Sequence, residues 1–292
     1  MRKIIFIIIA SLFFKISQAQ QNDAQALFYN VGIHSVFSGI GAVINKKPND
    51  KFGKTFLKGF AQGALGGYLV FESKRLIRTF YREDDFVYVW PSKVLNAAGT
   101  SITENAVSNI NFWEKWHLNI GFNRFEINTK EKFKLKYRIM PFALAGTIVT
   151  ASQGKFDFER SLKTGTFVFT TDFISPNRVE NARVNGRVPL FTNSVLILNN
   201  QAGDDALAHE LIHTYQYESF SFVNSYLDKP LNDLFANTES GFLKTYNKIF
   251  YTDFNFLVVN ALFGIEDLNS NTAFDNFFER EADYYSNRFR FD

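Results

Sequence analysis

The sequence of 292 residues predicts an α+β fold, with a helical region at each end and an antiparallel sheet between them. Three observations predict it. Residues 20–110 contain two long semi-apolar stretches rich in small residues, as packed helices are. Within residues 111–200, apolar and polar residues partly alternate, which is typical of strands. Residues 201–292 return to segments without such alternation, so a second helical region is expected there.

The chain opens with the three-part pattern of an export signal. Met1–Lys3 is basic, Ile4–Phe14 is apolar, and Ser17–Ala19 offers small residues for cleavage. The apolar run is too short to span a bilayer comfortably, and a membrane anchor is the alternative. We therefore expect residues 1–19 to be a removed signal peptide. Since the chain also lacks cysteine, it fits an exported protein of the bacterial periplasm, the outer surface or the medium.

The region 20–110 is expected to be mainly helical. Its two stretches are Ala24–Ile44 and Thr55–Ile77. The second stretch carries glycines at a spacing of four, and such a ridge of small residues lets helices approach closely. A transmembrane hairpin would show the same pattern, but polar residues interrupt both stretches: Asn30, His34, Lys58, Gln62 and Glu72. Packed helices are therefore favoured, with peripheral membrane association left open.

Residues 111–200 are expected to form an antiparallel sheet. Three segments within 117–171 alternate in part, the last of them Thr164–Thr171, and turn residues separate them, as in strands joined by hairpins. Asn193–Asn200 is a short apolar run rich in branched residues, which is typical of a buried strand. His117 lies close to two tryptophans, and a packed or surface position is expected for it rather than a metal-ligand role.

Composition excludes some functions. The net charge of +3 is weak, and no basic cluster is interleaved with aromatic residues, so nucleic-acid binding is not expected. The apolar fraction of 46% and the charged fraction of 21% are those of an ordinary globular protein. The glycines lack the pattern and the partner lysine of a phosphate-binding loop.

The stretch Asp204–Gln216 carries the strongest functional pattern. It contains His209, Glu210 and His213 in the order H-E-x-x-H. On a helix, residues four apart lie on one face, so the two histidines can bind one metal ion. Glu210 lies beside the first histidine, where it can accept a proton from water on the metal. The alternatives are histidines on an ordinary helix surface and a purely structural metal site.

A catalytic zinc needs a third protein ligand and one open position. No histidine follows His213, so a downstream carboxylate is the expected ligand. In the helix-like segment Phe277–Tyr285, Glu279 and Asp283 are four apart, so one face carries a ligand and a second acid. That second acid can accept the outer N–H of a ligand histidine and fix its orientation. Glu281 points roughly the opposite way and is the weaker candidate, and an ordinary solvated acidic helix is the alternative.

With H-E-L-I-H followed much later by E-x-x-A-D, the chain resembles the gluzincin metallopeptidases. It is most similar to the HtpX and CAAX-endopeptidase type and to bacterial extracellular domains with H-E-x-x-H-x-x-Q. The resemblance covers roughly residues 195–290. It implies a zincin-like helical region in which Zn²⁺ is bound by three ligands, His209, His213 and Glu279. It also implies that Asp283 supports these ligands, whereas the role of Gln216, which matches the x-x-Q extension, stays open.

These patterns predict an exported zinc metallopeptidase that acts on a peptide or protein substrate. Glu210 is expected to be the general base, and an extended substrate is expected to pair with the sheet edge near Val195–Asn199. Tyr284 and Tyr285 are candidates for steadying the oxyanion. The alternative is a non-enzymatic envelope or membrane-associated protein with a structural or vestigial metal site. The presence of Glu210 favours chemistry, because a structural site needs no proton acceptor.

Overall fold

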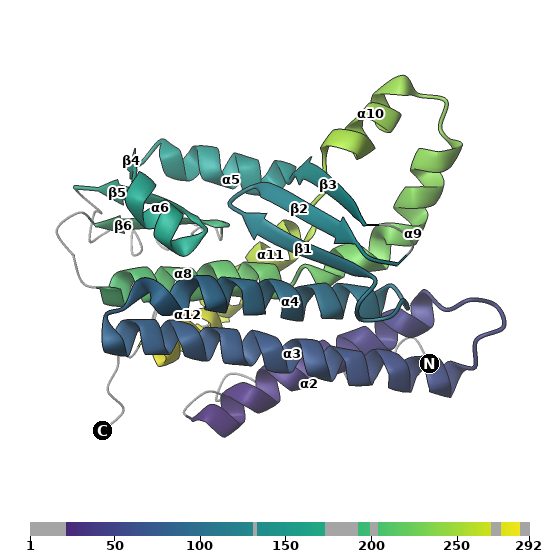
Figure 1. Ribbon diagram of the computed structural model, residues 1–292, viewed down its shortest axis with the longest axis horizontal. Coiled ribbons are helices and arrows are strands. Elements are labelled where there is room, and N and C mark those ends of the chain that lie inside the picture. The colour runs from purple at the N-terminus through teal and green to yellow at the C-terminus, as the bar shows by residue number, and fades with distance from the viewer. Residues whose placement is uncertain (1–21, 131–132, 173–191, 199–203, 270–275, 287–292) are drawn as a thin grey trace.

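The computed structural model describes five parts of the chain, which are residues 22–130, 133–172, 192–198, 204–269 and 276–286. The predicted signal peptide, residues 1–19, lies outside the described residues. Within the described parts the fold is α+β, as predicted, with long helices towards both ends and small sheets between them (Figure 1).

Three long helices form a layer along one side of the molecule (Figure 1). They are α2 (Asp23–Ile44), α3 (Phe52–Glu83) and α4 (Val89–Val107), and the short helix η2 (Phe86–Tyr88) joins the last two. α3 packs along both α2 and α4. The two helices predicted within residues 20–110 are therefore confirmed, and a third one completes the layer.

Glycines bring α2 and α3 into backbone contact. A Cβ atom added at Gly67 would lie 2.5 Å from the carbonyl oxygen of Asn30, and one at Gly63 would meet the carbonyl oxygen of His34. Gly59 faces α2 in the same way. No side chain fits at such distances, so the predicted ridge at a spacing of four is the contact surface of α3.

By length and composition alone, α2 could cross a membrane. Of the 18 consecutive residues that form the most apolar part of α2, 39% are buried in the fold. The buried residues include Asn30, His34 and Ser38, and Nδ1 of His34 lies 3.0 Å from the hydroxyl of Thr103 on α4. α2 is thus packed within the described fold, and contact with a membrane stays a prediction.

The first sheet is antiparallel, as predicted. It consists of β1 (Lys115–Ile120), β2 (Asn123–Asn128) and β3 (Lys134–Ile139), in that order. Gly121, with a φ of +55°, lies in the tight turn between the first two strands, where a positive φ favours glycine. β1 packs on α4, so this sheet covers part of the helical layer.

The second sheet corrects the prediction of antiparallel hairpins throughout residues 111–200. Its strands are β4 (Lys155–Phe156), β5 (Phe167–Thr171) and β6 (Ser194–Leu198), and β5 pairs in parallel with β6. Two helices, α5 (Pro141–Ala151) and α6 (Phe158–Thr164), also lie in this region. Alternation identifies a strand but not the direction of its neighbour, so the pattern could not reveal the parallel pair.

After β6 the described chain is helical, as predicted for residues 201–292. The helices are α8 (Asp204–Ser219), α9 (Phe222–Asn237), α10 (Gly241–Ile249), α11 (Asn255–Asn269) and α12 (Phe277–Ser286). α8 runs between the helical layer and the second sheet (Figure 1). Its apolar residues share one core with Ile77 of α3, Ile197 of β6 and Ala282 of α12. This core holds α8 in place against all three elements.

Candidate metal centre

The helix α8 presents the H-E-x-x-H pattern towards α12. Leu211 and Ile212, between the two histidines, are fully buried in the core and fix the rotation of the helix. The rings of His209 and His213 meet edge to face, with centroids 4.7 Å apart. Their side chains are only 5% and 13% exposed. The structure thus brings the two predicted histidines together at one partly buried point.

The helix α12 brings the third predicted ligand to the same point. Its apolar side, including Phe277 and Phe278, is buried, and Glu279 projects towards α8. Oε2 of Glu279 lies 3.2 Å from Nε2 of His209, and Oε1 lies 3.5 Å from Nε2 of His213. Among the described residues, these three side chains form a group that could hold a metal ion.

The spacing of the three donors suits a small tetrahedral ion. The two histidine Nε2 atoms are 3.0 Å apart, and the carboxylate oxygens lie 3.2 and 3.5 Å from them. A tetrahedral zinc with ligand bonds of about 2.0–2.2 Å separates its donors by about 3.3–3.6 Å. Two imidazoles and one carboxylate are also donors that zinc prefers. The spacing and the donor types are therefore compatible with a bound metal ion.

Acidic side chains make this point attractive to a cation. Burial lowers the pKa of His209, but Asp283 and Glu279 outweigh burial and raise this pKa to about 10. Against the effect of burial, Glu279 also raises the pKa of His213. Burial raises the pKa of Glu279, yet the two histidines lower it overall. Protons and a metal ion compete for the same nitrogens, so metal binding releases protons.

Asp283 supports His209 from the side opposite to its metal-facing nitrogen. Oδ1 of Asp283 lies 2.9 Å from Nδ1 of His209, and the aspartate side chain is 3% exposed. The two groups lie within ion-pair distance, and the contact with Asp283 raises the pKa of His209. A carboxylate at this place keeps a proton on Nδ1 and leaves Nε2 free for a metal.

Gln216 occupies the equivalent place beside His213. Its Oε1 lies 2.8 Å from Nδ1 of His213, and its Nε2 donates to Oε2 of Glu281 and to the carbonyl oxygen of Phe278, at 2.8 Å each. The carboxylate and the carbonyl only accept, so the amide must turn its NH₂ group towards them and its oxygen towards the histidine. Nδ1 of His213 is then the donor, and its Nε2 faces the metal position. In the sequence, Gln216 was indicated only by its match to the x-x-Q extension of the H-E-x-x-H motif.

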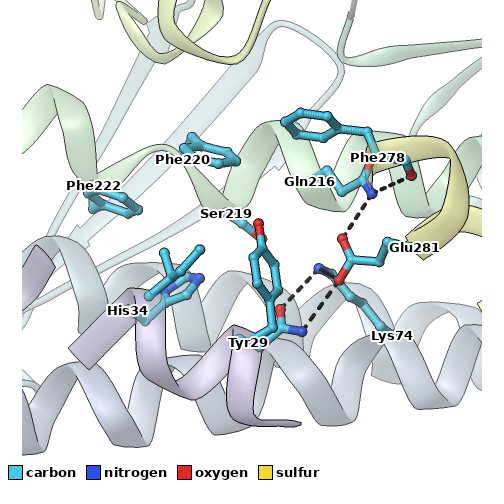
Figure 2. A pocket seen from close by; sticks show the side chains of 11 residues that line it. Tyr29, His34, Lys74, Gln216, Ser219, Phe220, Phe222, Phe278 and Glu281 are labelled. Carbon is cyan, nitrogen blue, oxygen red and sulfur yellow. Dashed lines mark hydrogen bonds and ion pairs between the residues drawn. The ribbon is translucent and has the colours of Figure 1, made fainter. Parts of the chain in front are cut away.

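A buried ion pair between Lys74 and Glu281 contacts the amide of Gln216 through Glu281 (Figure 2). Nζ of Lys74, on α3, donates to Oε1 of Glu281 at 2.8 Å and to Oδ1 of Asn30, on α2, at 3.0 Å. The side chains of Lys74 and Glu281 are each 1% exposed. They line a cavity of about 10 Å³, which has room for about one water molecule. Glu281 therefore faces α3 and lies outside the ligand group, on the other side of α12 from Glu279.

Glu210 follows His209 on α8 and is partly exposed to solvent. Its negative charge contributes to the raised pKa values of both His209 and His213, so its carboxylate lies within electrostatic reach of their rings. A carboxylate at this place is suited to accept a proton from a nucleophile at the fourth ligand position.

Other residues that the sequence singled out lie elsewhere. The hydroxyl of Tyr284 contacts Asp23 and accepts a hydrogen bond from Arg78, and Tyr285 is fully buried in the core. We therefore assign neither tyrosine the role of stabilising an oxyanion. His117 is 7% exposed and lies within hydrogen-bond distance of two hydroxyl groups of α4, which confirms its expected packed position.

Comparisons with models of protein families, with curated proteins and with solved structures give no match for this chain. The resemblance to gluzincins therefore depends on two short motifs and on the group of side chains that they form. His209, His213 and Glu279 form a group that could hold a metal ion.

Proposed function

We propose that this chain is an exported zinc metallopeptidase, which hydrolyses peptide bonds in a peptide or protein substrate. The convergence of three donors at near-tetrahedral spacing carries the proposal: Nε2 of His209, Nε2 of His213 and the carboxylate of Glu279. Three such donors with one open position are typical of catalytic zinc, whereas structural zinc usually has four protein ligands. A carboxylate beside the group, Glu210, supports hydrolysis over a structural role.

The side chains around the ligands have separate tasks. Zinc, when bound there, lowers the pKa of water and polarises a substrate carbonyl. Glu210 takes a proton from the attacking water and passes it to the leaving nitrogen as the C–N bond breaks. Asp283 and Gln216 hold the two histidine rings, so that both Nε2 atoms stay directed at one point.

The strand β6 is the proposed docking place for an extended substrate. It is the outer strand of the second sheet within the described residues, and its Val195 and Ile197 share a core with α8. Backbone groups on the free side of an edge strand can pair with an extended peptide. The substrate main chain would then run beside the helix that carries the histidines. Asn199, the last residue of the predicted docking edge, lies outside the described residues.

A cleavage assay of the mature protein, residues 20–292, on an unbiased peptide library tests the proposal. We expect cleavage that a zinc chelator abolishes and added zinc restores. Glu210→Gln should keep its zinc and lose hydrolysis by about 10²–10⁴-fold, because an amide does not accept the proton. Bound zinc without cleavage by the parent would contradict the proposal and favour a non-enzymatic envelope protein with a structural metal site.

A further inference from the structure

The sheet β1-β2-β3 turns its polar face towards the helices and its apolar face outwards. Cross-strand partners share a face, and the face on the side of α4 carries only polar residues. On it, His117 and Arg124 are 7% and 3% exposed, whereas Leu135 and Tyr137 on the opposite face are 64% and 48% exposed. Antiparallel sheets ordinarily bury the apolar face. Core packing does not explain why β1 and β2 bury polar residues on this face, on which Lys134 and Lys136 of β3 stay exposed.

A cavity of about 600 Å³ lies against this polar face. Its other walls come from α4, α9, α10 and residues 250–252. The candidate metal ligands do not line it, so the cavity and the metal centre are separate places in the described fold. The volume falls within the range of about 300–1,000 Å³ that is typical of pockets for small ligands.

A row of alternating charges forms part of the cavity lining. Arg124 donates to Oε2 of Glu104 at 2.6 Å and, through Nε, to Glu126 at 2.9 Å. Arg138 ends the row with two bonds to Glu126, at 2.9 and 2.6 Å. Both guanidinium groups lie over the ring of Tyr251, at 4.0 and 4.6 Å from its centre. The row is internally neutral and held in place by these contacts.

Beyond this row the cavity has an excess of positive charge. Three lysines, Lys115, Lys134 and Lys136, and one further acid, Asp228, complete its charged lining. The lining therefore holds five basic and three acidic side chains. Burial raises the pKa of Asp228, whereas the nearby positive charges of Lys115 and Arg124 lower it in part. Burial lowers the pKa of Lys136, and the nearby positive charges of Arg138 and Lys115 lower it further, against the effect of Glu126.

Aromatic rings line the cavity next to the lysines. Tyr246 stacks with Phe235 and with Phe250, with ring centroids 6.4 and 5.0 Å apart and interplanar angles of 29° and 27°. Such rings offer a flat apolar surface that can pack against another flat group.

We propose that this cavity binds a small ligand that carries two negative charges, on carboxylate or phosphate groups, next to a flat apolar part. The excess of two basic side chains matches two negative charges. Guanidinium and ammonium groups donate well to carboxylate and phosphate oxygens, and the aromatic wall suits the flat part. The ligand site is independent of the proposed peptidase activity, because it shares no residue with the metal centre.

Binding of three matched probes tests the proposal. Phenyl phosphate and phenylsuccinate combine a ring with two negative charges, and benzyl alcohol is the neutral control. We expect calorimetry on the mature protein to show binding of at least one dianion, and weaker binding at higher salt, because salt screens charge. Benzyl alcohol should bind at least about tenfold more weakly. A preference between the two dianions distinguishes a phosphate ligand from a carboxylate ligand.

A double variant locates the bound probe. Lys134→Gln/Lys136→Gln removes two exposed charges from the cavity, neither of which forms an ion pair within the described residues. We expect it to bind the dianions about tenfold more weakly. Lys54→Gln/Lys155→Gln, which removes two exposed lysines outside the cavity, should bind like the parent. His213→Ala should also bind like the parent, because it changes only the metal centre.

Three binding results with the parent or the cavity variant would overturn the proposal. They are equal affinity of the cavity variant and the parent, benzyl alcohol binding as tight as the dianions, and no binding of either dianion. Loss of binding in His213→Ala would assign the anion to the metal centre and also overturn it. These binding measurements can be interpreted even if the cleavage assay fails, because none of them depends on hydrolysis.

Discussion

Gln216 lies between His213 and Glu281, and the direction of its amide decides which nitrogen of His213 faces Glu279. The amide oxygen lies 2.8 Å from Nδ1 of the histidine, and the amide nitrogen donates to the carboxylate at the same distance. Lys74 holds that carboxylate from α3. A buried charge pair between α3 and α12 therefore orients a candidate ligand on α8.

Replacement of the amide should weaken metal binding without unfolding the protein. Gln216→Met keeps the approximate size of the side chain but removes both of its hydrogen-bonding groups. The ring of His213 then loses the partner at Nδ1, and zinc affinity should fall by about 10–100-fold. Competition with a chromophoric chelator measures the affinity, and ¹⁵N NMR of the ring reports the tautomer.

The matched control for this change is Gln62→Met, which alters a partly buried glutamine on α3, outside the metal centre. It should bind zinc like the parent. If Gln216→Met also keeps the parent affinity and the parent tautomer, the amide does not position His213.

The ligand group itself makes a simple prediction. The mature protein should contain about one zinc per chain, and His213→Ala and Glu279→Ala should each lose nearly all of it. Asp283→Asn should bind zinc about 10–100-fold more weakly, because it supports a ligand without being one. Elemental analysis and zinc titration measure both effects. Glu239→Ala removes an exposed acid of the same region and serves as the control. Zinc retained by Glu279→Ala would exclude Glu279 as a ligand.

The structure gives Glu281, the weaker ligand candidate in the sequence, a place in a buried ion pair. Its carboxylate is fully buried and pairs with Lys74. Glu281→Leu leaves the lysine charge without this partner in the core, which should lower the free energy of unfolding by about 3–5 kcal/mol. Lys74→Met/Glu281→Leu removes both charges and should recover most of that stability.

Urea denaturation separates these two variants. Zinc titration adds a second measurement, because neither variant offers Gln216 its carboxylate partner. The double variant should therefore stay weak in zinc binding although it is stable. Equal stability of the single and double variants would show that the charge pair does not matter for folding.

Acid should lower the free energy of unfolding through protonation of Glu126. Burial raises the pKa of this residue, but Arg124 and Arg138 outweigh burial and lower it from the ordinary 4.5 to about 2. Because the folded-state pKa lies below the unfolded one, Glu126 stabilises the fold above pH 4.5 and loses this effect as the pH falls towards 2. The full effect is on the order of 3 kcal/mol.

Urea denaturation of the parent and of Glu126→Gln at pH 7 and pH 3 measures this effect. The difference in unfolding free energy between them should be smaller at pH 3. Glu159→Gln, whose side chain is 77% exposed, provides the control. A difference that stays the same at both pH values would contradict the link to Glu126.

The positions of the candidate ligands were predictable because they depend on local spacing. His209 and His213 are four apart on one helix, and Glu279 with Asp283 repeats that spacing on another. The sequence could therefore indicate which face of each helix carries the acids and the histidines. The contact with Lys74 was not predictable, because it joins residues 207 positions apart and a lysine within a helix gives no sign of a buried partner.

The sheets show a different limit. Alternation shows that a strand has two unlike faces, but it does not show which face is turned inwards. In the first sheet the inward face is the polar one, opposite to the ordinary arrangement. In the second sheet the parallel pairing of β5 with β6 depends on a distant part of the chain, so the local pattern carried no information about it.

The close approach of α2 and α3 extends the sequence requirements of the metal centre to a residue with no side chain. Asn30 reaches Lys74 while Gly67 allows the two backbones to touch. A methyl group at Gly67 would meet the carbonyl oxygen of Asn30 at 2.5 Å, so the helices would have to separate. That shift would disturb Lys74, then Glu281 and Gln216, before it reached His213. The N-terminal helices are thus part of the structure that supports the candidate metal centre, and a fragment that starts at α8 should not reproduce its metal affinity.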